Sequence, residues 1–402
     1  MRIVPSSNVL PHLLQSFEDE LRELQDRDLF RRLATIEEVR GAEVRLDGRW
    51  LACWCGNDYL GLSLHPAVIR AAALAAARWG TGARASRLLS GSTTLHAGLE
   101  DALAEFFGAE GAVVFASGYL ANLGTLSALV GPRDLVAVDR LAHASLIDAC
   151  RASRATLRVF PHNDAAALSR LLTRRAGRRL VVTEGVFSMD GDRAPLAALL
   201  DAVQQHEASL YVDDAHGACV LGETGRGSPE EAGVPHEALL YMGTLGKALG
   251  AQGGFVAGPK PLIELLQNRA RTFIYATALA VPVAAAALEA LRIVREDPSP
   301  RAMLRRNIEH LHARLTILPK AELMPSEARQ MGFPASHIIP VVVGSARRAR
   351  ELSAELLERG ILAPAIRPPT VPEGTARIRL SVSALHTDEH VDALATALRD
   401  LL

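Results

Sequence analysis

Short β-rich runs alternate with helical stretches between residues 95 and 260, and this alternation constrains the fold more than any other feature of the sequence. Strands separated by helices form parallel βαβ units, which assemble into a doubly wound α/β sheet. Several runs are apolar on both faces, as expected of strands that helices cover on each side. The sequence therefore predicts an α/β fold with a large, mostly parallel sheet. The β-rich runs are AVVFA (112–116), DLVAVD (134–139), TLRVF (156–160), RLVVTEGVF (179–187), SLYVDDAHG (209–217) and GFVAG (254–258).

The sections on either side of this alternation predict two further units. A chain of 402 residues is long enough for two or three domains, and its apolar content of 49% can fill a large core. We expect an N-terminal helix and β excursion over 1–60, a large domain over 61–295 and a small C-terminal α+β domain over 296–402. The elements expected in the outer sections are a helix over 11–34, a hairpin around Asp47-Gly48, helices over 301–316, 345–359 and 387–402, a strand over 337–344, and a hairpin-like pair over 361–366 and 376–383.

The charge balance gives no indication of a nucleic acid or a membrane as partner. Charged residues make up 22% of the chain and the net charge is −1. The N-terminal segment lacks the long apolar run of a signal peptide. The Ala-rich stretch over 280–292 is interrupted by Pro282 and Glu289, so we interpret it as a buried helix and not as a membrane span. We therefore expect a cytoplasmic protein that binds neither nucleic acid nor membrane.

The four cysteines, Cys53, Cys55, Cys150 and Cys219, do not make a disulfide framework in a chain of this length. We expect reduced thiols. Cys53 and Cys55 belong to a strand-like run and should point to opposite faces, which is a poor arrangement for a metal pair. The sequence predicts no metal site.

Lys247 lies in a glycine-flanked turn, GTLGKA (243–248), after a β-like segment. A phosphate-binding P-loop needs Ser or Thr after its lysine, and here Ala248 follows. A lysine in such a turn can form a Schiff base if it is desolvated, so that its amine is neutral near neutral pH. An ordinary surface lysine would fit the local sequence equally well.

Two residues further back in the chain supply partners that a pyridoxal 5′-phosphate site requires. Asp213 and His216 end an apolar strand, at the carboxyl edge where open α/β sheets bind ligands. A carboxylate such as that of Asp213 can pair with the pyridinium nitrogen and keep it protonated. His216 is placed to bond the phenolic oxygen of the cofactor. A plain strand-end turn would also fit this segment.

The cofactor's phosphate and ring need further contacts. Gly118 and Tyr119 open a helical run after a strand, and such a helix start binds phosphate through its backbone amides. The hydroxyl of Thr244, three residues before Lys247, can donate to the same phosphate. His143 suits the task of supporting the ring, although a lone histidine is more often an ordinary surface or core residue.

Seven motifs follow one another in a specific order: NDYLGL (57–62), ASGYLAN (116–122), LAHASLIDA (141–149), TEGVFSMDGD (183–192), VDDAHG (212–217), GETGRG (222–227) and TLGKALG (244–250). Together they resemble the α-oxoamine synthases, which are fold-type I pyridoxal-phosphate-dependent enzymes. The resemblance extends over essentially the whole chain, from about residue 57 to residue 383. Members of that family condense an amino acid with an acyl-CoA and release CO₂. The resemblance thus implies an acyltransferase with pyridoxal 5′-phosphate as cofactor.

The resemblance also implies roles for individual side chains. Lys247 matches the Schiff-base lysine, which then acts as the base at the substrate Cα. Asp213 matches the partner of the pyridinium nitrogen, and His143 matches the ring-stacking histidine, which can bond the thioester oxygen. Asn57 and Arg379 match the groups that hold the amino-acid carboxylate. The remaining matches concern the cofactor and are His216 at the phenolic oxygen, the hydroxyl of Ser188, and the phosphate contacts of Gly118, Tyr119 and Thr244.

The segment AIRPPTVPEGTARIRLSVSALHT (365–387) is the most informative about the substrates. IRPPTVP followed by GTARIRL looks like the branch of the family that condenses L-alanine with a pimeloyl thioester, on CoA or on a carrier protein, in biotin synthesis. Arg31 and Thr370 match further substrate contacts of that branch. The alternatives are a 2-amino-3-oxobutyrate CoA ligase, a 5-aminolevulinate synthase or serine palmitoyltransferase type, an aminotransferase of the same fold, and a non-catalytic partner.

Fold-type I sites are usually completed by a second subunit. The segment YAT (275–277) looks like the one that reaches across, so we expect a homodimer with shared active sites. One departure concerns the loop GARASR (82–87), where Ala85 replaces a glycine that is common in the family. Alanine removes backbone freedom at that position.

Overall fold

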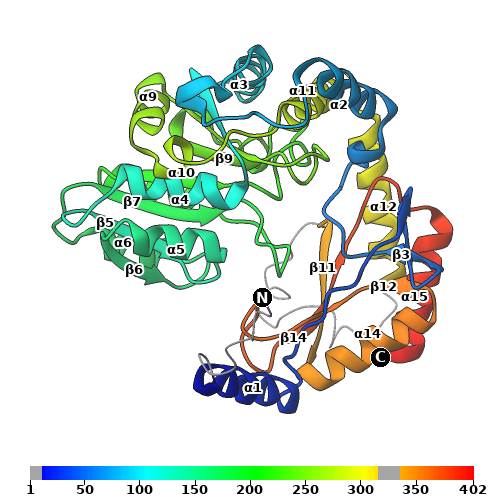
Figure 1. Ribbon diagram of the computed structural model, residues 1–402. Coiled ribbons are helices and arrows are strands. Elements are labelled where there is room, and N and C mark those ends of the chain that lie inside the picture. The colour runs from blue at the N-terminus through cyan, green and yellow to red at the C-terminus, as the bar shows by residue number, and fades with distance from the viewer. Residues whose placement is uncertain (1–10, 316–335) are drawn as a thin grey trace, which may run out of the picture.

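The computed structural model describes residues 11–315 and 336–402. Its central sheet consists of β4 (Gly111–Phe115), β5 (Leu135–Asp139), β6 (Thr156–Phe160), β7 (Arg179–Glu184), β8 (Ser209–Asp213), β9 (Leu240–Thr244) and β10 (Gly254–Gly258). The order is β4-β10-β9-β8-β7-β5-β6. β6, β5, β7, β8 and β9 run parallel, and β10 is antiparallel to both of its neighbours (Figure 1). The predicted mostly parallel α/β sheet is confirmed.

Helices cover both faces of this sheet because successive strand residues point to opposite sides. Val136 and Val138 of β5 pack toward α4 and α5, whereas Leu135 and Ala137 pack toward α6 and α7. α9 and α10 lie on the same face as α4 and α5. On the opposite face, α3 and α11 cover the part of the sheet that α6 and α7 leave open, and α2 packs on α11. The helices are α2 (Pro66–Trp79), α3 (Thr94–Phe107), α4 (Gly118–Leu129), α5 (Ala144–Ala152), α6 (Ala165–Leu172), α7 (Leu196–Gln205), α8 (Ser228–Glu231), α9 (Lys260–Arg269), α10 (Arg271–Ile274) and α11 (Val281–Glu296).

The C-terminal section forms a second body beside the large sheet, as Figure 1 shows. Its three-stranded sheet, of order β11-β14-β13, is antiparallel. The elements are α12 (Ser299–Leu315), β11 (Ile338–Gly344), α14 (Ala346–Glu358), β12 (Ile361–Leu362), β13 (Ala365–Ile366), β14 (Ala376–Ser381) and α15 (Asp388–Leu401).

The N-terminal section joins this C-terminal body. β1 (Glu38–Arg40), β2 (Glu43–Leu46) and β3 (Arg49–Cys53) form the hairpin-containing sheet, to which β12 adds a fourth, parallel strand. The expected hairpin-like pair over 361–366 and 376–383 is confirmed for β13, which pairs antiparallel with β14, and is wrong for residues 361–362, which pair with β3. α1 (Pro11–Asp26) ends before the predicted residue 34, since the chain turns there toward the C-terminal section.

The two neighbouring cysteines do not point to opposite faces as expected. Their sulfur atoms lie 3.7 Å apart. Cys53 is the last residue of β3, and Cys55 follows it in a bend, so the alternation of a strand does not extend to Cys55. All four cysteines are free thiols.

Among the described residues, no helix combines the length and the apolar character needed to cross a membrane.

Phe107, at the end of α3, provides a test of the packing on the second face of the sheet. Its fully buried ring contacts the rings of Tyr241 and Phe255, with centroids 4.8 and 5.2 Å away. We expect Phe107→Ala to lower the free energy of unfolding by about 3–5 kcal/mol, because the change leaves a cavity between helix and sheet. Urea unfolding followed by circular dichroism measures this loss. Leu74→Ala, at a side chain 72% exposed on α2, is the control, and equal midpoints for the two variants would contradict the assignment.

Candidate active site

A cavity of about 210 Å³ lies where β7, β8 and β9 end and α4 begins. The structure brings together there the predicted residues Gly118, Tyr119, His143, Asp213, His216, Thr244 and Lys247. Asn122, Ser145 and Glu184 also line the cavity and were not predicted from the sequence. The other predicted residues, Arg31, Asn57, Ser188, Thr370 and Arg379, do not line it and are placed below.

Lys247 follows β9 in a turn and points its amine at the side chain that follows β8. Its Nζ lies 2.8 Å from Nε2 of His216. Burial lowers the pKa of Lys247 to about 8, although the charges of Asp213 and Glu184 oppose this shift. The amine can therefore lose its proton close to physiological pH, which a Schiff-base lysine requires.

Asp213 is a buried carboxylate held by hydrogen-bond donors. The amide of Asn122 donates to its Oδ2 at 2.7 Å, and the backbone N–H of Ala215 donates to its Oδ1 at 3.0 Å. Tyr211 orients Asn122, since its hydroxyl donates to the amide oxygen at 2.8 Å. Asn122 follows Gly118 by one helical turn on α4, so the motif ASGYLAN contained it, but only the folded helix shows its direction.

His143 caps the N-terminus of α5 in a defined tautomer. The backbone N–H of Ser145 donates to Nδ1 at 3.2 Å, so the proton of the neutral ring resides on Nε2. Burial lowers the pKa of His143 and keeps the ring neutral. Glu184 accepts the backbone N–H of His143 at 2.6 Å, and burial raises the pKa of this carboxyl well above its usual value. The ring thus offers a hydrogen-bond donor at Nε2.

His216 is the centre of a chain of polar contacts. The hydroxyl of Tyr59 lies 2.6 Å from its Nδ1, and burial together with the nearby cations of Lys247 and Arg379 lowers its pKa well below the usual value. Arg379 donates to the Tyr59 hydroxyl at 3.3 Å, and that hydroxyl donates to Asn57 at 3.3 Å. Tyr59 belongs to the motif NDYLGL and was missed, although it connects Asn57 and Arg379 with His216.

Arg379 lies on β14 and is almost completely buried. Its Nε donates to the backbone oxygen of Ser188 at 2.5 Å, and its Nη1 donates to the hydroxyl of Ser381 at 3.1 Å. These bonds fix the planar guanidinium beside Tyr59. A guanidinium in a fixed plane is suited to hold a carboxylate by two parallel bonds.

The start of α4 is a closely packed candidate site for an anion. Gly118 begins the helix, and a Cβ there would lie 3.0 Å from Cε of Met242. The hydroxyl of Thr244 accepts from the N–H of Gly246 at 3.2 Å and donates to the oxygen of Gly253 at 2.9 Å. The free N–H groups of a helix start attract phosphate oxygens. Tyr119 is 42% exposed, and its hydroxyl bonds the carboxylate of Asp148.

A larger hollow of about 1090 Å³ adjoins the cavity and shares His143 with it. Ser188 and Thr370 line this hollow. Arg31 does not line the hollow. Its guanidinium donates to the backbone oxygen of Pro368 at 3.2 Å, and Pro368 is one of the residues that line the hollow. Ala85 does not have a positive φ, whereas its neighbour Arg84 has a φ of 67°. An alanine therefore fits position 85 without backbone strain.

The residues at the small cavity fit pyridoxal 5′-phosphate. A partly buried lysine amine, a buried carboxylate without a cationic partner among the described residues, and a helix start at a glycine face one space. The amine is suited to bind the carbonyl carbon of that cofactor, the carboxylate its ring nitrogen, and the helix start its phosphate. The hydrogen-bonded amide of Asn122 leaves the Asp213 carboxylate oriented for such a partner.

Comparisons with known proteins agree with this arrangement. Residues 52–398 match the family described as aminotransferase class I and II. The chain is 47% identical to an 8-amino-7-oxononanoate synthase of Geobacter sulfurreducens over 96% of this chain and 97% of that protein. It is also 47% identical to one of Chromobacterium violaceum, over 95% and 97%.

Solved structures show the same fold. A serine palmitoyltransferase from S. paucimobilis with bound pyridoxal phosphate superposes with a TM-score of 0.90, at 30% identity and 98% coverage of both chains. An 8-amino-7-oxononanoate synthase from Francisella tularensis superposes with a TM-score of 0.71, at 28% identity, over 87% of this chain and 98% of that one. The near-complete coverage, the matching family and the cofactor-like cavity place this chain in the aminotransferase class I and II family, among the pyridoxal-phosphate-dependent 8-amino-7-oxononanoate synthases.

Proposed function

We propose that this protein condenses L-alanine with a pimeloyl thioester to give 8-amino-7-oxononanoate, CO₂ and a free thiol, a step of biotin biosynthesis. The observation that carries the proposal is the partly buried amine of Lys247, which faces the same cavity as Asp213 in a chain similar over nearly its full length to 8-amino-7-oxononanoate synthases. The pKa of Lys247, lowered to about 8, makes its amine available as nucleophile and base.

Bound pyridoxal 5′-phosphate supplies a carbonyl carbon for amines and an electron sink for charge that develops at the substrate Cα. Lys247 would hold this cofactor, Asp213 would pair with its ring nitrogen, and His216 would contact its phenolic oxygen. The hydroxyl of Ser188, which lines the adjoining hollow, would contribute a further cofactor contact. The start of α4 at Gly118 and the hydroxyl of Thr244 would hold its phosphate.

The protein's own groups would then bind and move protons. Arg379 and Asn57 hold the carboxylate of alanine, because the guanidinium is buried and oriented beside Tyr59. The neutral amine of Lys247 removes the proton from the alanine Cα. His143, with its proton on Nε2, donates a hydrogen bond to the thioester oxygen as negative charge develops there.

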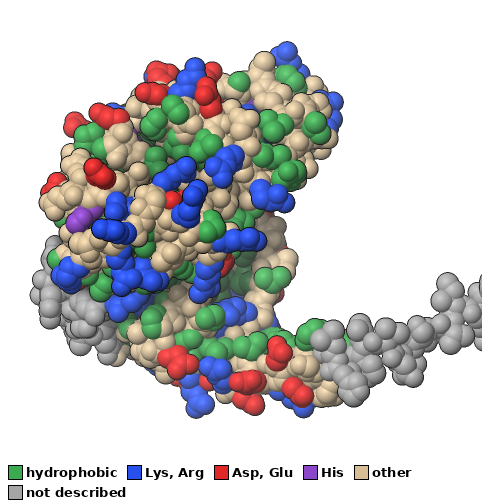
Figure 2. All heavy atoms as spheres, turned by 90° about the vertical axis from the view of Figure 1, so that its left-hand side faces the viewer, with side chains coloured by type: hydrophobic (Ala, Val, Ile, Leu, Met, Phe, Trp, Pro, Cys, Tyr) green, Lys and Arg blue, Asp and Glu red, His purple; other side chains and the backbone are tan. Residues whose placement is uncertain are grey.

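The acyl donor would enter through the hollow of about 1090 Å³ that adjoins His143. The segment over 131–179 borders this hollow through Arg140 and Arg151 and contains ten arginines against four acidic residues, in a chain whose net charge is −1. Figure 2, which looks onto the β6 edge of the sheet, shows many basic side chains across this face. A basic surface of this kind is suited to attract an anionic acyl carrier, whether CoA or a carrier protein.

The proposal includes a homodimer. Ser86 and Thr277 form an antiparallel bridge. The loop over 82–87 therefore lies beside the segment over 275–277, which is predicted to reach into the second subunit. Leu89 and Tyr275 next to them are 81% and 70% exposed in the single chain. Sedimentation equilibrium should therefore give twice the mass of the chain, and a fully active monomer would contradict this part of the proposal.

A substrate panel tests the reaction itself. Thiol release should be fastest with alanine and pimeloyl-CoA, and mass spectrometry should identify 8-amino-7-oxononanoate. Faster release with glycine, or with serine and a long-chain acyl-CoA, would instead support a sister branch of the family. Transfer of the amino group from alanine to a keto acid, without use of thioester, would support an aminotransferase.

Replacement of the lysine tests the proposed covalent anchor. Lys247→Ala should lower turnover by about 10³-fold or more, as removal of a covalent catalytic group does, and should abolish the visible absorbance band of the bound cofactor. Lys260→Ala, at an exposed lysine on α9, is the control and should retain both properties. An active Lys247→Ala protein with an unchanged absorbance band would overturn the assignment.

The lowered pKa of Lys247 predicts how cofactor capture depends on pH. Only the unprotonated amine reacts, so the rate at which the apoprotein captures pyridoxal 5′-phosphate should rise about tenfold per pH unit up to about pH 8 and then level off. An exposed lysine, with a pKa near 10.5, would give a rate that still rises above pH 9. Stopped-flow absorbance measures the rate, and a continued rise to pH 10 would contradict the assignment.

A further inference from the structure

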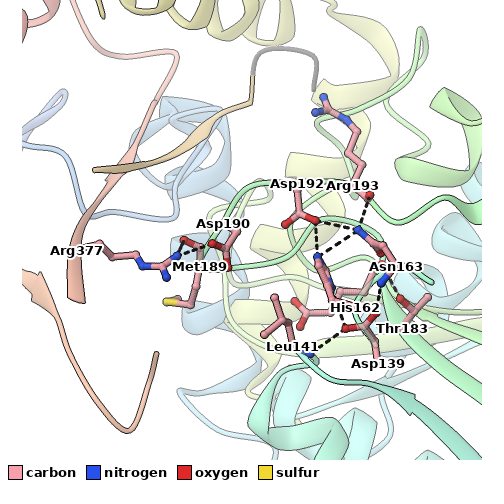
Figure 3. A network of polar contacts seen from close by, with 11 residues as sticks. Asp139, Leu141, His162, Asn163, Thr183, Met189, Asp190, Asp192, Arg193 and Arg377 are labelled. Carbon is pink, nitrogen blue, oxygen red and sulfur yellow. Dashed lines mark hydrogen bonds and ion pairs between the residues drawn. The ribbon is translucent and has the colours of Figure 1, made fainter. Parts of the chain in front are cut away.

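His162 lies just beyond β6, outside the cofactor cavity, between two carboxylates (Figure 3). Its Nδ1 is 2.9 Å from Oδ1 of Asp139, and its Nε2 is 2.7 Å from Oδ2 of Asp192. Asp139 is fully buried and Asp192 is 4% exposed. Both ring nitrogens therefore face acceptors, and only the protonated ring can donate to both.

The charges in this network require the cation. Two buried carboxylates that share one space are strongly destabilised unless a positive group neutralises them. Burial of the ring opposes its protonation, but the bonds to Asp139 and Asp192 and their charges raise the pKa of His162 to about 10. The imidazole also packs against the ring of Phe187 in a T-shaped arrangement, with the ring centroids 4.4 Å apart.

One of the carboxylates shapes the turn that precedes His143. Asp139 ends β5, and its Oδ1 accepts the backbone N–H of Leu141 at 2.8 Å. Its backbone oxygen accepts the N–H of Ala142 at 3.1 Å. The next residue is His143, whose N–H donates to Glu184. The position of Asp139 therefore determines how the chain enters α5.

The other carboxylate closes the turn that carries Ser188. The backbone oxygen of Asp192 accepts the N–H of Phe187 at 2.9 Å, and the amide of Asn163 donates to its side chain at 2.9 Å. Two arginines of β14 hold the same turn from the C-terminal body. Arg377 donates to Asp190 at 2.5 Å, and Arg379 donates to the backbone oxygen of Ser188 at 2.5 Å. The turn is thus bonded from both bodies of the molecule.

We propose that His162 is a positioning residue whose charged ring joins the turn before His143 to the turn that carries Ser188. It touches neither cofactor nor substrate, and it fixes the distance between two side chains that the reaction uses. This inference rests on the proposed function insofar as it concerns turnover. The position of the bound cofactor, which Ser188 and His143 contact in that proposal, is a separate consequence.

His162→Gln tests the proposal in the holoenzyme, because glutamine keeps a donor but loses the charge and the second bond. We expect kcat with alanine and pimeloyl-CoA to fall about 10- to 100-fold, since small displacements of reacting groups have effects of this size. We also expect the visible circular dichroism of the bound cofactor to change. His206→Gln is the matched control, because the ring of His206 bonds the hydroxyl of Ser169 and does not line the cavity.

A second variant restores the charge balance. In His162→Gln/Asp192→Asn one of the two carboxylates is neutral, so part of the lost turnover and of the cofactor's circular dichroism should return. If the single variant does not fold, Asp192→Asn alone keeps the ring and its bond to Asp139, and should change the circular dichroism by weakening the turn at Ser188. A folded His162→Gln protein with unchanged kcat, KM and circular dichroism would overturn the proposal, as would an unchanged Asp192→Asn protein.

The pH dependence of unfolding gives an independent readout. The pKa of His162 is about 10 in the folded protein and near 6.5 in the unfolded chain, so its contribution to stability is complete below about pH 6.5 and is lost as the pH rises through 10. The charged groups that face the ring are Asp139 from β5 and Asp192 from the turn after β7. The stability difference between the wild-type protein and His162→Gln should therefore shrink from pH 6.5 to pH 10, and a constant difference would contradict the charged bridge.

These readouts separate the inference from the proposed function. If the wild-type protein does not condense alanine with pimeloyl-CoA, the proposed function fails. The circular dichroism of the bound cofactor and the pH dependence of unfolding still test His162, because neither measurement needs an acyl donor.

Discussion

The site depends on the desolvation of one amine at the end of β9. Burial disfavours the charged form of Lys247, whereas Asp213 and Glu184 favour it, and the balance leaves the pKa near 8. These groups meet only because β7, β8 and β9 are parallel and end at the same edge of the sheet. An antiparallel sheet would have distributed them over two edges. The imidazole of His216, 2.8 Å from the amine, is neutral. It therefore gives the amine a hydrogen-bond partner and adds no charge that would shift the pKa of Lys247.

The sequence predicted those parts of the molecule that follow from local pattern. The alternation of β-rich and helical runs predicted the sheet, and the strand-end position of Asp213 and the turn of Lys247 predicted the centre of the cavity. Asn122 and Tyr59 could not be predicted from local pattern, because their roles arise from contacts with distant elements, to Asp213 and to Arg379. The division of 361–366 between two sheets has the same cause, since backbone pairing across the chain decides it.

The comparisons separate fold from chemistry. A serine palmitoyltransferase superposes more closely, with a TM-score of 0.90, than the oxononanoate synthase of Francisella tularensis does, with a TM-score of 0.71. Sequence identity does not follow the same order throughout, because it is 28% to the Francisella synthase and 30% to the palmitoyltransferase but 47% to the oxononanoate synthase of Geobacter sulfurreducens. The same backbone therefore supports more than one acyl donor. Thr370 and the prolines before it line the large hollow, which is the proposed entry of the acyl donor.

The parallel pairing of β12 with β3 has a consequence for biosynthesis. The contact between Arg379 and Tyr59 joins residues 320 positions apart, and β3 gains its last partner only when β12 has been synthesised. While the ribosome adds residues one by one, the seven-stranded sheet can assemble first, since all of its strands lie between residues 111 and 258. Arg379, proposed to hold the amino-acid carboxylate, meets Tyr59 only near the end of translation. A nascent chain can thus form the cavity around Lys247 before the proposed carboxylate-binding arginine has been added.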